Sequence, residues 1–441
     1  MTNETDFGPA SANTEPEPLR RRRTLWFLYQ YGIAAHEPGI TRHAVLARSM
    51  KPHGWDSVFF SSSSHYWNLQ GQGGRAKGVE RLPEATFVRI RTSAVMTNGI
   101  RRIVSNVTFT LRAALRSTRR RRLGVAKPDV VIGPSPHLFG PLGAYAVARA
   151  YRVPFVLEVD DLWPDTLIDL LGVKESHPFI RVLRMIEVFL YKRASAIIGV
   201  LPGVEDHVRS LAPDAGPVYW IPNGVDVSAI PPVQPLVKRD GFMVLYAGAH
   251  GVPNALDSML QAARIVQRRE EDMLPATRTT FVLVGEGKEK AHLIETAARL
   301  GLTNVEFRAA VPSTQVPALL SSADALAITW LDRPLYRHGI SPNKLYDYFG
   351  AGRPVVMALS SPHDPVSSAH AGITVPAENP QAFADAVLDL RAMSPQDRIR
   401  LGLNGRKFVE EHHNVADLAA KFASVLDSVT RIETSDSSRG K

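Results

Sequence analysis

The segment HGISPNKLYDYFGAGRPVV, residues 338–356, carries groups suited to an anionic ligand. Ser341 is a favourable N-cap and Pro342 suits the first helical position, so we expect a helix that begins at Pro342. The amides of Asn343 and Lys344 would then lie at the positive end of the helix dipole. Such an end can bind a diphosphate, and the Lys344 side chain would add a positive charge.

Asp347 lies further along the same predicted helix, where its carboxylate could accept a hydrogen bond from a ribose hydroxyl. Gly350 and Gly352 should end the helix, and Pro354 should open a strand. Taken alone, the segment also fits a capped surface helix whose charges are solvated.

Two glycine-containing turns in the same half of the chain follow predicted strands. The residues that could contact a ligand there are Gly248, His250, Gly251, Gly285, Gly287 and Lys288. Glycine lets backbone amides approach a phosphate because no Cβ stands in the way. Tight turns and a solvated lysine explain the same residues equally well. A dinucleotide fingerprint would need a further glycine where Lys290 stands.

In the first half of the chain, Asp161 follows an apolar strand and should therefore point beyond the strand's carboxyl end. A carboxylate there could orient a hydroxyl group or stabilise developing positive charge. The alternative is that Asp161 caps the following helix. Gly39 and Thr41 open the first loop–helix turn, where backbone amides could meet a β-phosphate or a sugar.

The elements that must position these residues form two series of short apolar strands alternating with helices. The first series has strands at 24–29, 57–61, 86–90, 130–133, 155–159, 196–200 and 218–221, and the second at 242–248, 280–285, 305–308, 325–329 and 354–358. This alternation predicts an α/β fold with two doubly wound, Rossmann-like domains, each built on a parallel sheet covered on both faces. Open sheets of this kind bind ligands beyond the carboxyl ends of their strands, so we expect the site in the cleft between the domains.

The proline-rich stretch 222–241 has no periodic pattern and marks the domain border. We expect a disordered tail over 1–19, an N-terminal domain over 20–225 and a C-terminal domain over 226–414. A helix over 415–430 should pack back on the first domain, and 431–441 should form a second tail.

Composition narrows the chemistry further. The 441 residues include no cysteine, which excludes disulfides, thiolate zinc sites and cysteine nucleophiles. No group of His, Asp and Glu has metal-ligand spacing, so we expect neither a metal nor another cofactor.

Residues 1–200 carry 28 Lys and Arg against 16 Asp and Glu, a net charge of +12, whereas the rest of the chain has a net charge of −3. The basic half suggests an anionic partner surface.

The basic excess is concentrated in a predicted helix over 99–122, where apolar residues recur at helical spacing among arginines. One interpretation is a surface helix that covers the first sheet. The other is a peripheral contact with an anionic membrane through Arg101, Arg102, Arg112, Arg116, Arg119 and Arg120. Nucleic acid is disfavoured because no aromatic side chains alternate with these arginines. The polar N-terminus and the lack of a long apolar run predict a cytoplasmic protein, either soluble or peripheral at the inner face of the cell membrane.

Five motifs in six segments together resemble retaining glycosyltransferases of family 4, which have the GT-B fold. They are residues 39–43 (GITRH), 158–165 (EVDDLWPD), 221–226 (IPNGVD), 246–251 (YAGAHG) together with 283–287 (LVGEG), and 338–356. The resemblance runs from about Thr24 to Val429 and is strongest to the bacterial branch that builds surface polysaccharides, which includes fucosamine transferases. It implies a UDP- or GDP-sugar donor, a lipid-linked or saccharide acceptor, and transfer of a hexosyl or N-acetylhexosaminyl group with retention. By the same resemblance, 20–225 would be the acceptor-side domain and 226–414 the nucleotide-sugar-binding domain. Asp161 would then lie near the reacting centre, where it could orient the acceptor hydroxyl or stabilise oxocarbenium-like charge.

The sequence departs from the family pattern at two places. The family's pair of glutamates falls at Gly339 and Asp347, so the first acid is absent and the second is shorter. Asp160 stands where the branch has an arginine. Two alternatives remain open, namely a sugar-nucleotide epimerase of the same architecture and a non-catalytic, membrane-associated binding protein.

Overall fold

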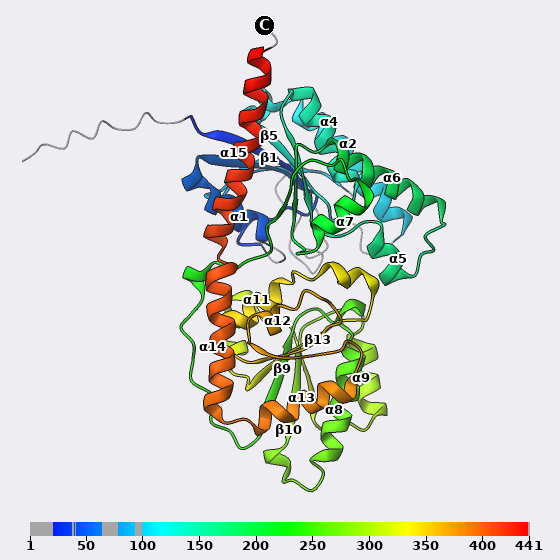
Figure 1. Ribbon diagram of the computed structural model, residues 1–441, viewed down its shortest axis with the longest axis vertical. Helices are drawn as coiled ribbons and strands as arrows, with labels where there is room; N and C mark the ends of the chain where they lie inside the picture. Colours follow the sequence, from blue (N-terminus) through cyan, green and yellow to red (C-terminus); the bar gives the residue numbers. More distant parts are fainter. Residues whose placement is uncertain (1–20, 38, 40, 64–77, 93–98, 440–441) are drawn as a thin grey trace, which may run out of the picture.

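The computed structural model describes residues 21–37, 39, 41–63, 78–92 and 99–439. The tail expected over 1–19 lies outside these residues. The described chain forms two α/β domains stacked along the long axis of the molecule (Figure 1). The prediction of two doubly wound, Rossmann-like domains is confirmed.

The N-terminal domain is built on an eight-stranded sheet in the order β3-β4-β2-β1-β5-β6-β7-β8. Its strands are β1 (Arg23–Leu28), β2 (Trp55–Ser62), β3 (Gly78–Arg81), β4 (Thr86–Ile90), β5 (Val130–Pro134), β6 (Phe155–Val159), β7 (Ala196–Gly199) and β8 (Val218–Trp220). All pair in parallel except β3, which is antiparallel to β4 and was not predicted. Apolar side chains cover both faces of the sheet, as the continuous apolar strands require.

Helices flank this sheet on both sides. They are α1 (Arg42–Met50), α2 (Ile100–Ser117), α3 (Arg120–Leu123), α4 (Phe139–Tyr151), α5 (Asp165–Leu171), α6 (Pro178–Arg193) and α7 (Val204–Leu211). The single helix expected over 99–122 is interrupted at Thr118 and Arg119, so α2 and the short α3 are separate. Helices α2, α4 and α6 lie together on one side of the domain (Figure 1).

The C-terminal domain has a six-stranded parallel sheet in the order β11-β10-β9-β12-β13-β14. Its strands are β9 (Phe242–Ala247), β10 (Thr279–Val284), β11 (Val305–Arg308), β12 (Ala325–Thr329), β13 (Val355–Ala358) and β14 (Gly372–Val375). Its helices are α8 (Leu256–Arg269), α9 (Lys290–Arg299), α10 (Val316–Ser321), α11 (Asn343–Gly350), α12 (Pro365–Ser368), α13 (Pro380–Ala392) and α14 (Pro395–His412). As in the first domain, buried apolar clusters lie on both faces of the sheet.

The last helix, α15 (Val415–Arg439), returns to the N-terminal domain and packs along α1 (Figure 1). Its buried side chains, among them Leu418, Phe422 and Leu426, join the core under β1 and β2. The helix continues to Arg439, so residues 431–439, which we expected to form a tail, are helical.

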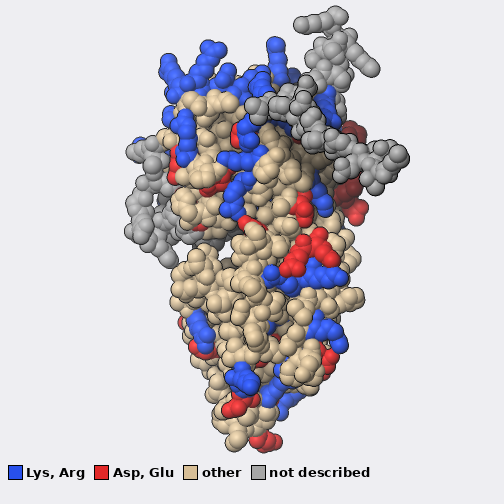
Figure 2. Space-filling model, turned by 90° about the vertical axis from the view of Figure 1, so that its left-hand side faces the viewer, with Lys and Arg blue, Asp and Glu red and all other residues tan. Residues whose placement is uncertain are grey.

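The charge asymmetry of the sequence is visible on the surface. On the face drawn in Figure 2, Lys and Arg crowd the free end of the N-terminal domain, whereas both signs mix over the C-terminal domain. Among the described residues, no helix combines the length and the hydrophobicity needed to cross a bilayer.

Candidate active site

A cavity of about 370 Å³ lies in the cleft between the two domains. Its N-terminal wall includes Tyr29 and Asp160, which directly follow β1 and β6, and its C-terminal wall includes Trp330, which follows β12. The cavity therefore opens at the carboxyl ends of strands from both sheets, where doubly wound folds bind ligands.

Helix α11 begins one residue later than the sequence predicted. Pro342 has extended backbone angles (φ −80°, ψ 127°), so Asn343 is the first helical residue and Ser341 does not cap the helix. The Ser341 hydroxyl instead accepts a hydrogen bond from the backbone N–H of Asn223 at 3.0 Å, and the Asn223 side chain donates to the Ser341 carbonyl. Ser341 thus links the segment before α11 to the connection between the two domains, in which Asn223 lies. Ser341, Asn343 and Asn223 all line the cavity.

Lys344 is a cation held without a carboxylate partner. Its Nζ atom donates to the Tyr246 hydroxyl at 2.9 Å and to Asn254 Oδ1 at 2.6 Å. It also lies over the rings of Tyr246 and Trp330, at 4.7 and 5.4 Å from their centres. Lys344 forms no ion pair within the part of the chain that the structure describes, and burial lowers its pKa to about 7. Because Asn254 and Trp330 line the cavity, this cation stands directly behind the cavity wall.

Asp347 lies one turn further along α11 and is not among the residues that line the cavity. Its side chain reaches solvent, but the surrounding protein excludes enough water to raise its pKa to about 7. Asp347 and Lys344 are therefore two ionisable groups on one helix whose charged forms are both disfavoured by desolvation.

The glycine turns of the C-terminal domain pack against each other. A Cβ on Gly285 would lie 1.9 Å from the Gly248 carbonyl oxygen, and one on Gly287 would lie 2.1 Å from the His250 carbonyl oxygen. A Cβ on Gly248 would lie 3.0 Å from Lys344 Nζ, so this glycine makes room for the lysine. These glycines were expected to let a phosphate approach the backbone. In the structure, Gly285 and Gly287 allow the two loops to pack closely, and Gly248 leaves room for Lys344.

The other predicted ligand contacts of these turns, His250, Gly251 and Lys288, differ in their exposure. His250 is fully buried between Tyr246 and Phe307, and neither ring nitrogen has a hydrogen-bond partner in the described chain. Burial lowers its pKa. The predicted contact of His250 with a donor is therefore not available in this conformation. Gly251 precedes a short 3₁₀ turn, and the Lys288 side chain is exposed; neither lines the cavity.

Asp161 lines the cavity from the N-terminal side. It does not cap α5, because that helix begins at Asp165 with Pro164 in the N-cap position. Desolvation raises the pKa of Asp161, and the positive charge of Arg102 opposes this shift. The carboxyl group is thus exposed to the cleft and free of the helix-capping role that was the alternative interpretation.

A charged cluster that sequence spacing did not reveal lies beside Asp161. Glu158 is fully buried and accepts hydrogen bonds from Arg42 at 3.1 Å and from His43 at 2.9 Å. Burial disfavours its charged form, but His43 and Arg42 outweigh this and lower its pKa. Burial and the nearby Glu158 raise the pKa of Asp160 to about 7.

This cluster is also the place where a cation could bind. One ligand atom from each of His43, Glu158 and Asp160 lies within 4.8 Å of the others. Arg42 already neutralises Glu158, so the cluster is charge-compensated as it stands. The residues come from α1 and from β6 and the loop after it, which explains why no spacing in the sequence indicated them. The expectation that no metal or cofactor is needed remains a prediction.

Gly39 and Thr41 stand at the entrance to α1, and neither lines the cavity. Gly39 is exposed, and Thr41 precedes the helix without capping it through its side chain. The next two residues, Arg42 and His43, face the cavity instead. The first loop therefore contributes to the site, but through the start of its helix.

Gly339, where the family has its first acid, is closely packed. Its φ of +87° is in the left-handed region, and a Cβ would lie 2.4 Å from Pro202 Cγ in the opposite domain. An acidic side chain has no room at this position in the present domain arrangement. Glycine here allows the two domains to approach each other at the edge of the cavity.

Comparison with known families gives matches in both domains. The family described as glycosyl transferase 4-like domain matches residues 39–224, and the family described as glycosyl transferases group 1 matches residues 241–392. No protein with a curated description matches the chain significantly.

Solved structures with similar folds cover nearly the whole chain. Sucrose-phosphate synthase from Thermosynechococcus elongatus has a TM-score of 0.71 at 15% identity and covers 93% of this chain and 100% of its own. Alpha,alpha-trehalose 6-phosphate synthase from Burkholderia multivorans has a TM-score of 0.67 at 12% identity, with coverages of 95% and 98%. Anabaena HepE, in complex with UDP and glucose, has a TM-score of 0.59 at 14% identity, with coverages of 92% and 100%. The two domain matches and the shared architecture show that the chain is a glycosyltransferase of the GT-B type.

Proposed function

We propose that this glycosyltransferase moves a hexosyl or N-acetylhexosaminyl group from a UDP- or GDP-sugar to a lipid-linked or saccharide acceptor, with retention, in the synthesis of a cell-surface polysaccharide or glycolipid. The structurally similar HepE is described in complex with UDP and glucose, which supports a nucleotide-sugar donor. The retaining outcome and the polysaccharide role rest on the resemblance of the sequence motifs to family 4.

The observation that carries this proposal is Lys344. A partly buried ammonium group without a carboxylate partner is unfavourable unless an anion binds beside it. The donor diphosphate is such an anion. The first backbone amides of α11, which have no acceptor within the helix, lie on the same side of the cavity. In this arrangement Lys344 and Asn343 hold the diphosphate. Asp347 and the turns that contain Gly248, Gly251 and Lys288 complete the donor side.

Asp161 is the proposed catalytic residue on the acceptor side. Asp160 and Asp161 both line the cavity from the N-terminal domain, and Asp161 is the more exposed of the two and does not cap α5. Its raised pKa suits a group that accepts a hydrogen bond from an acceptor hydroxyl and holds partial negative charge near the sugar as positive charge develops there.

The acceptor-side domain also has a surface suited to a membrane. On α2, Val104, Val107, Leu111 and Leu115 form one row whose side chains are 56%, 36%, 60% and 68% exposed. The inward face of the helix is formed by other residues, including Phe109 and Ala113. This row, which we call the α2 apolar row, is flanked by the exposed Arg101, Arg102, Arg112 and Arg119 and the half-buried Arg116 and Arg120. An amphipathic helix of this composition binds an anionic lipid surface, where a lipid-linked acceptor would be available.

The proposal is tested by incubating the purified chain with a panel of UDP- and GDP-sugars and following the products by NMR. We expect slow hydrolysis of one donor class without acceptor, and transfer with retained anomeric configuration when a lipid-linked saccharide is added. Epimerised nucleotide sugar in the acceptor-free sample would identify the epimerase alternative. Donor binding without any turnover would identify the non-catalytic alternative.

A further inference from the structure

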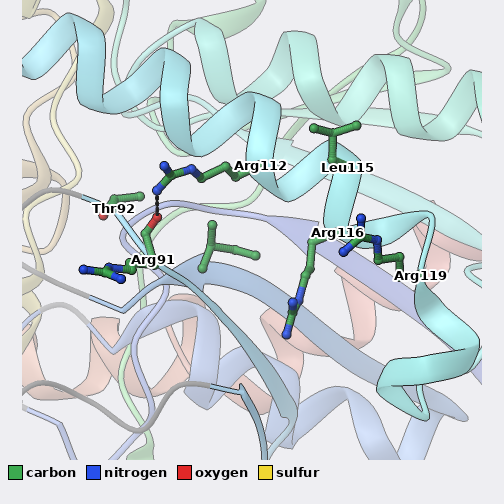
Figure 3. Close-up of a pocket in the computed structure, with 7 residues that line it drawn as sticks. Arg91, Thr92, Arg112, Leu115, Arg116 and Arg119 are labelled. Carbon is green, nitrogen blue, oxygen red and sulfur yellow. Dashed lines mark hydrogen bonds between the residues drawn. The ribbon is translucent and has the colours of Figure 1, made fainter.

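A second cavity, of about 680 Å³, lies on the outside of the N-terminal domain, away from the cleft. One wall is the end of β4 and the residues after it, and the other is the second half of α2 (Figure 3). We call it the arginine pocket, because four of its seven lining residues are arginines: Arg91, Arg112, Arg116 and Arg119, with Ile90, Thr92 and Leu115 completing the lining.

The arginines of this pocket are not neutralised by the described protein. Among the described residues, no acidic side chain lines the pocket and none of the four arginines forms an ion pair. Arg112 donates a hydrogen bond to the Arg91 carbonyl at 2.6 Å (Figure 3). The Arg116 Nε atom is buried and has no hydrogen-bond partner in the described part of the chain. Elsewhere in the same domain, Arg22 and Arg89 pair with carboxylates.

Four arginine side chains line this cavity without an acidic partner among the described residues, so an anion with several oxygens would find favourable charge there. Guanidinium groups bind phosphate oxygens through paired N–H donors, which makes phosphate the anion that suits this pocket best. A buried guanidinium Nε without a partner indicates a donor that still lacks its acceptor.

The apolar side chains beside the arginine pocket indicate which kind of molecule would carry the phosphate. Leu115 lines the pocket and is also the last member of the α2 apolar row. A ligand held by the arginines would therefore lie next to exposed leucine and valine side chains. This combination of a phosphate site and an adjoining apolar strip matches an amphiphile with a phosphate headgroup.

The arginine pocket lies too far from the cleft for a ligand bound there to take part in the reaction. Arg102, at the start of α2, acts electrostatically on Asp161, so the same helix leads from the cleft to the arginine pocket. From Arg102 to Arg116 the helix axis rises by about 20 Å. A phosphate in the pocket is therefore too far from Asp161 to react and serves as an anchor.

We infer that the arginine pocket binds the phosphate headgroup of a membrane lipid and so fixes the orientation of the acceptor-side domain on the bilayer. This inference rests on the proposed membrane contact and makes it specific for a phosphate group. A general basic surface would bind anionic lipids according to their charge alone. The arginine pocket binds an exposed phosphomonoester better than a phosphodiester of equal charge, because more phosphate oxygens are free to accept hydrogen bonds.

The test uses the full chain and vesicles of phosphatidylcholine with either phosphatidic acid or phosphatidylglycerol, adjusted to equal surface charge. Two double variants are compared, Arg112→Gln with Arg116→Gln in the pocket, and Arg121→Gln with Arg122→Gln on the neighbouring exposed surface. The wild-type chain should prefer phosphatidic acid by about tenfold, the effect of one to two charge-assisted hydrogen bonds. The pocket variant should lose this preference, and the surface variant should keep it.

Inorganic pyrophosphate serves as the soluble probe, since it should reduce the preference for phosphatidic acid in the wild-type chain. Equal binding of the two vesicle types, or equal losses in the two double variants, would overturn the inference. Pyrophosphate binding without a vesicle preference would also overturn it, because the ligand would then be a free phosphate. UDP affinity is measured for each variant as a control, and it should equal that of the wild-type chain. If the wild-type chain does not bind UDP, that result contradicts the proposed donor and leaves the lipid inference unaffected.

Discussion

Lys344 in α11 donates a hydrogen bond of 2.6 Å to the side chain of Asn254, in the loop that follows β9. The contact joins the first turn of α11 to the short 3₁₀ turn that precedes α8. It places a lysine whose pKa is about 7 at the wall of the cleft, where its charge depends on what binds beside it.

The first prediction concerns the proton on Lys344. A bound diphosphate favours the charged ammonium, so donor binding above pH 7 should take up a proton and UDP affinity should fall as the pH rises from 7 to 9. Calorimetry in buffers of different ionisation enthalpy measures this uptake directly. Lys344→Ala should abolish measurable UDP binding, whereas Lys407→Ala, which removes an exposed lysine of α14, should not change it. Unchanged UDP affinity in Lys344→Ala would refute the diphosphate assignment.

The same lysine has a consequence for stability in the absence of donor. Its folded-state pKa is below its unfolded value, so between about pH 7 and pH 10 the unfolded chain binds more protons and the Lys344 contribution to stability improves with pH. Lys344→Met should therefore stabilise the apo chain most at pH 7 and below, and the gain should shrink towards pH 10. Urea unfolding of the two proteins at several pH values checks this, and a gain that grows with pH would contradict it.

Asp161→Asn should separate chemistry from donor binding. The substitution keeps the shape of the side chain but removes the charge that faces the cleft, so we expect turnover to fall by about a hundredfold or more. UDP affinity should stay within about twofold, because the diphosphate is held by the opposite domain. Asp240→Asn, at an exposed position before β9, is the control. Loss of UDP affinity in Asp161→Asn, with turnover preserved at saturating donor, would remove Asp161 from the catalytic role.

Gly339→Ala tests whether the domains need glycine at the edge of the cleft. Alanine there has both an unfavourable positive φ and a Cβ at 2.4 Å from Pro202 Cγ. Gly301→Ala has a positive φ of 65° but no atom within 4 Å of the added Cβ, so it measures the cost of a positive φ without a steric clash. The clash, together with the φ of 87° and ψ of −175° at Gly339, should make Gly339→Ala less stable than Gly301→Ala by about 1–3 kcal/mol in denaturant unfolding. Equal stabilities would show that the domains separate freely at this point.

The α2 apolar row can be tested without disturbing the fold. Leu111→Asn and Leu115→Asn change side chains that are already exposed, so the unfolding midpoint should hardly move. Each should weaken binding to anionic vesicles by about tenfold, the effect of exposing one leucine side chain. Leu274→Asn, 73% exposed in the C-terminal domain, should leave vesicle binding unchanged. Similar effects of all three variants would indicate that α2 does not enter the membrane.

Much of the fold was predictable because its signals are local. Apolar runs of strand length, helical periodicity and the proline-rich border around 222–241 each depend on neighbouring residues, and together they specify two doubly wound domains. The start of α11 was misplaced by one residue, because Ser341 bonds to Asn223, more than a hundred residues away, rather than to its own helix. Local capping preferences contain no information about such a partner.

Two other features depend on the tertiary structure. The cluster of Arg42, His43 and Glu158 forms only when α1 packs beside the end of β6. The periodicity of α2 revealed an apolar stripe but not its direction, and the structure turns Phe109 and Ala113 inward and leaves the stripe exposed. A sequence period identifies a face, and only packing decides whether that face meets protein or solvent.

The return of α15 to the N-terminal domain means that the chain crosses between the domains twice. The crossings lie side by side, since Val225 donates to the His413 carbonyl and Val415 donates to the Val225 carbonyl, each at 2.9 Å. With a single interdomain connection, one domain can rotate relative to the other about any axis through that connection. Two adjacent connections restrict this rotation to one axis. Opening and closing of the cleft is thereby confined to rotation about one line, so each closure returns Lys344 and Asp161 to the same relative position across the cavity.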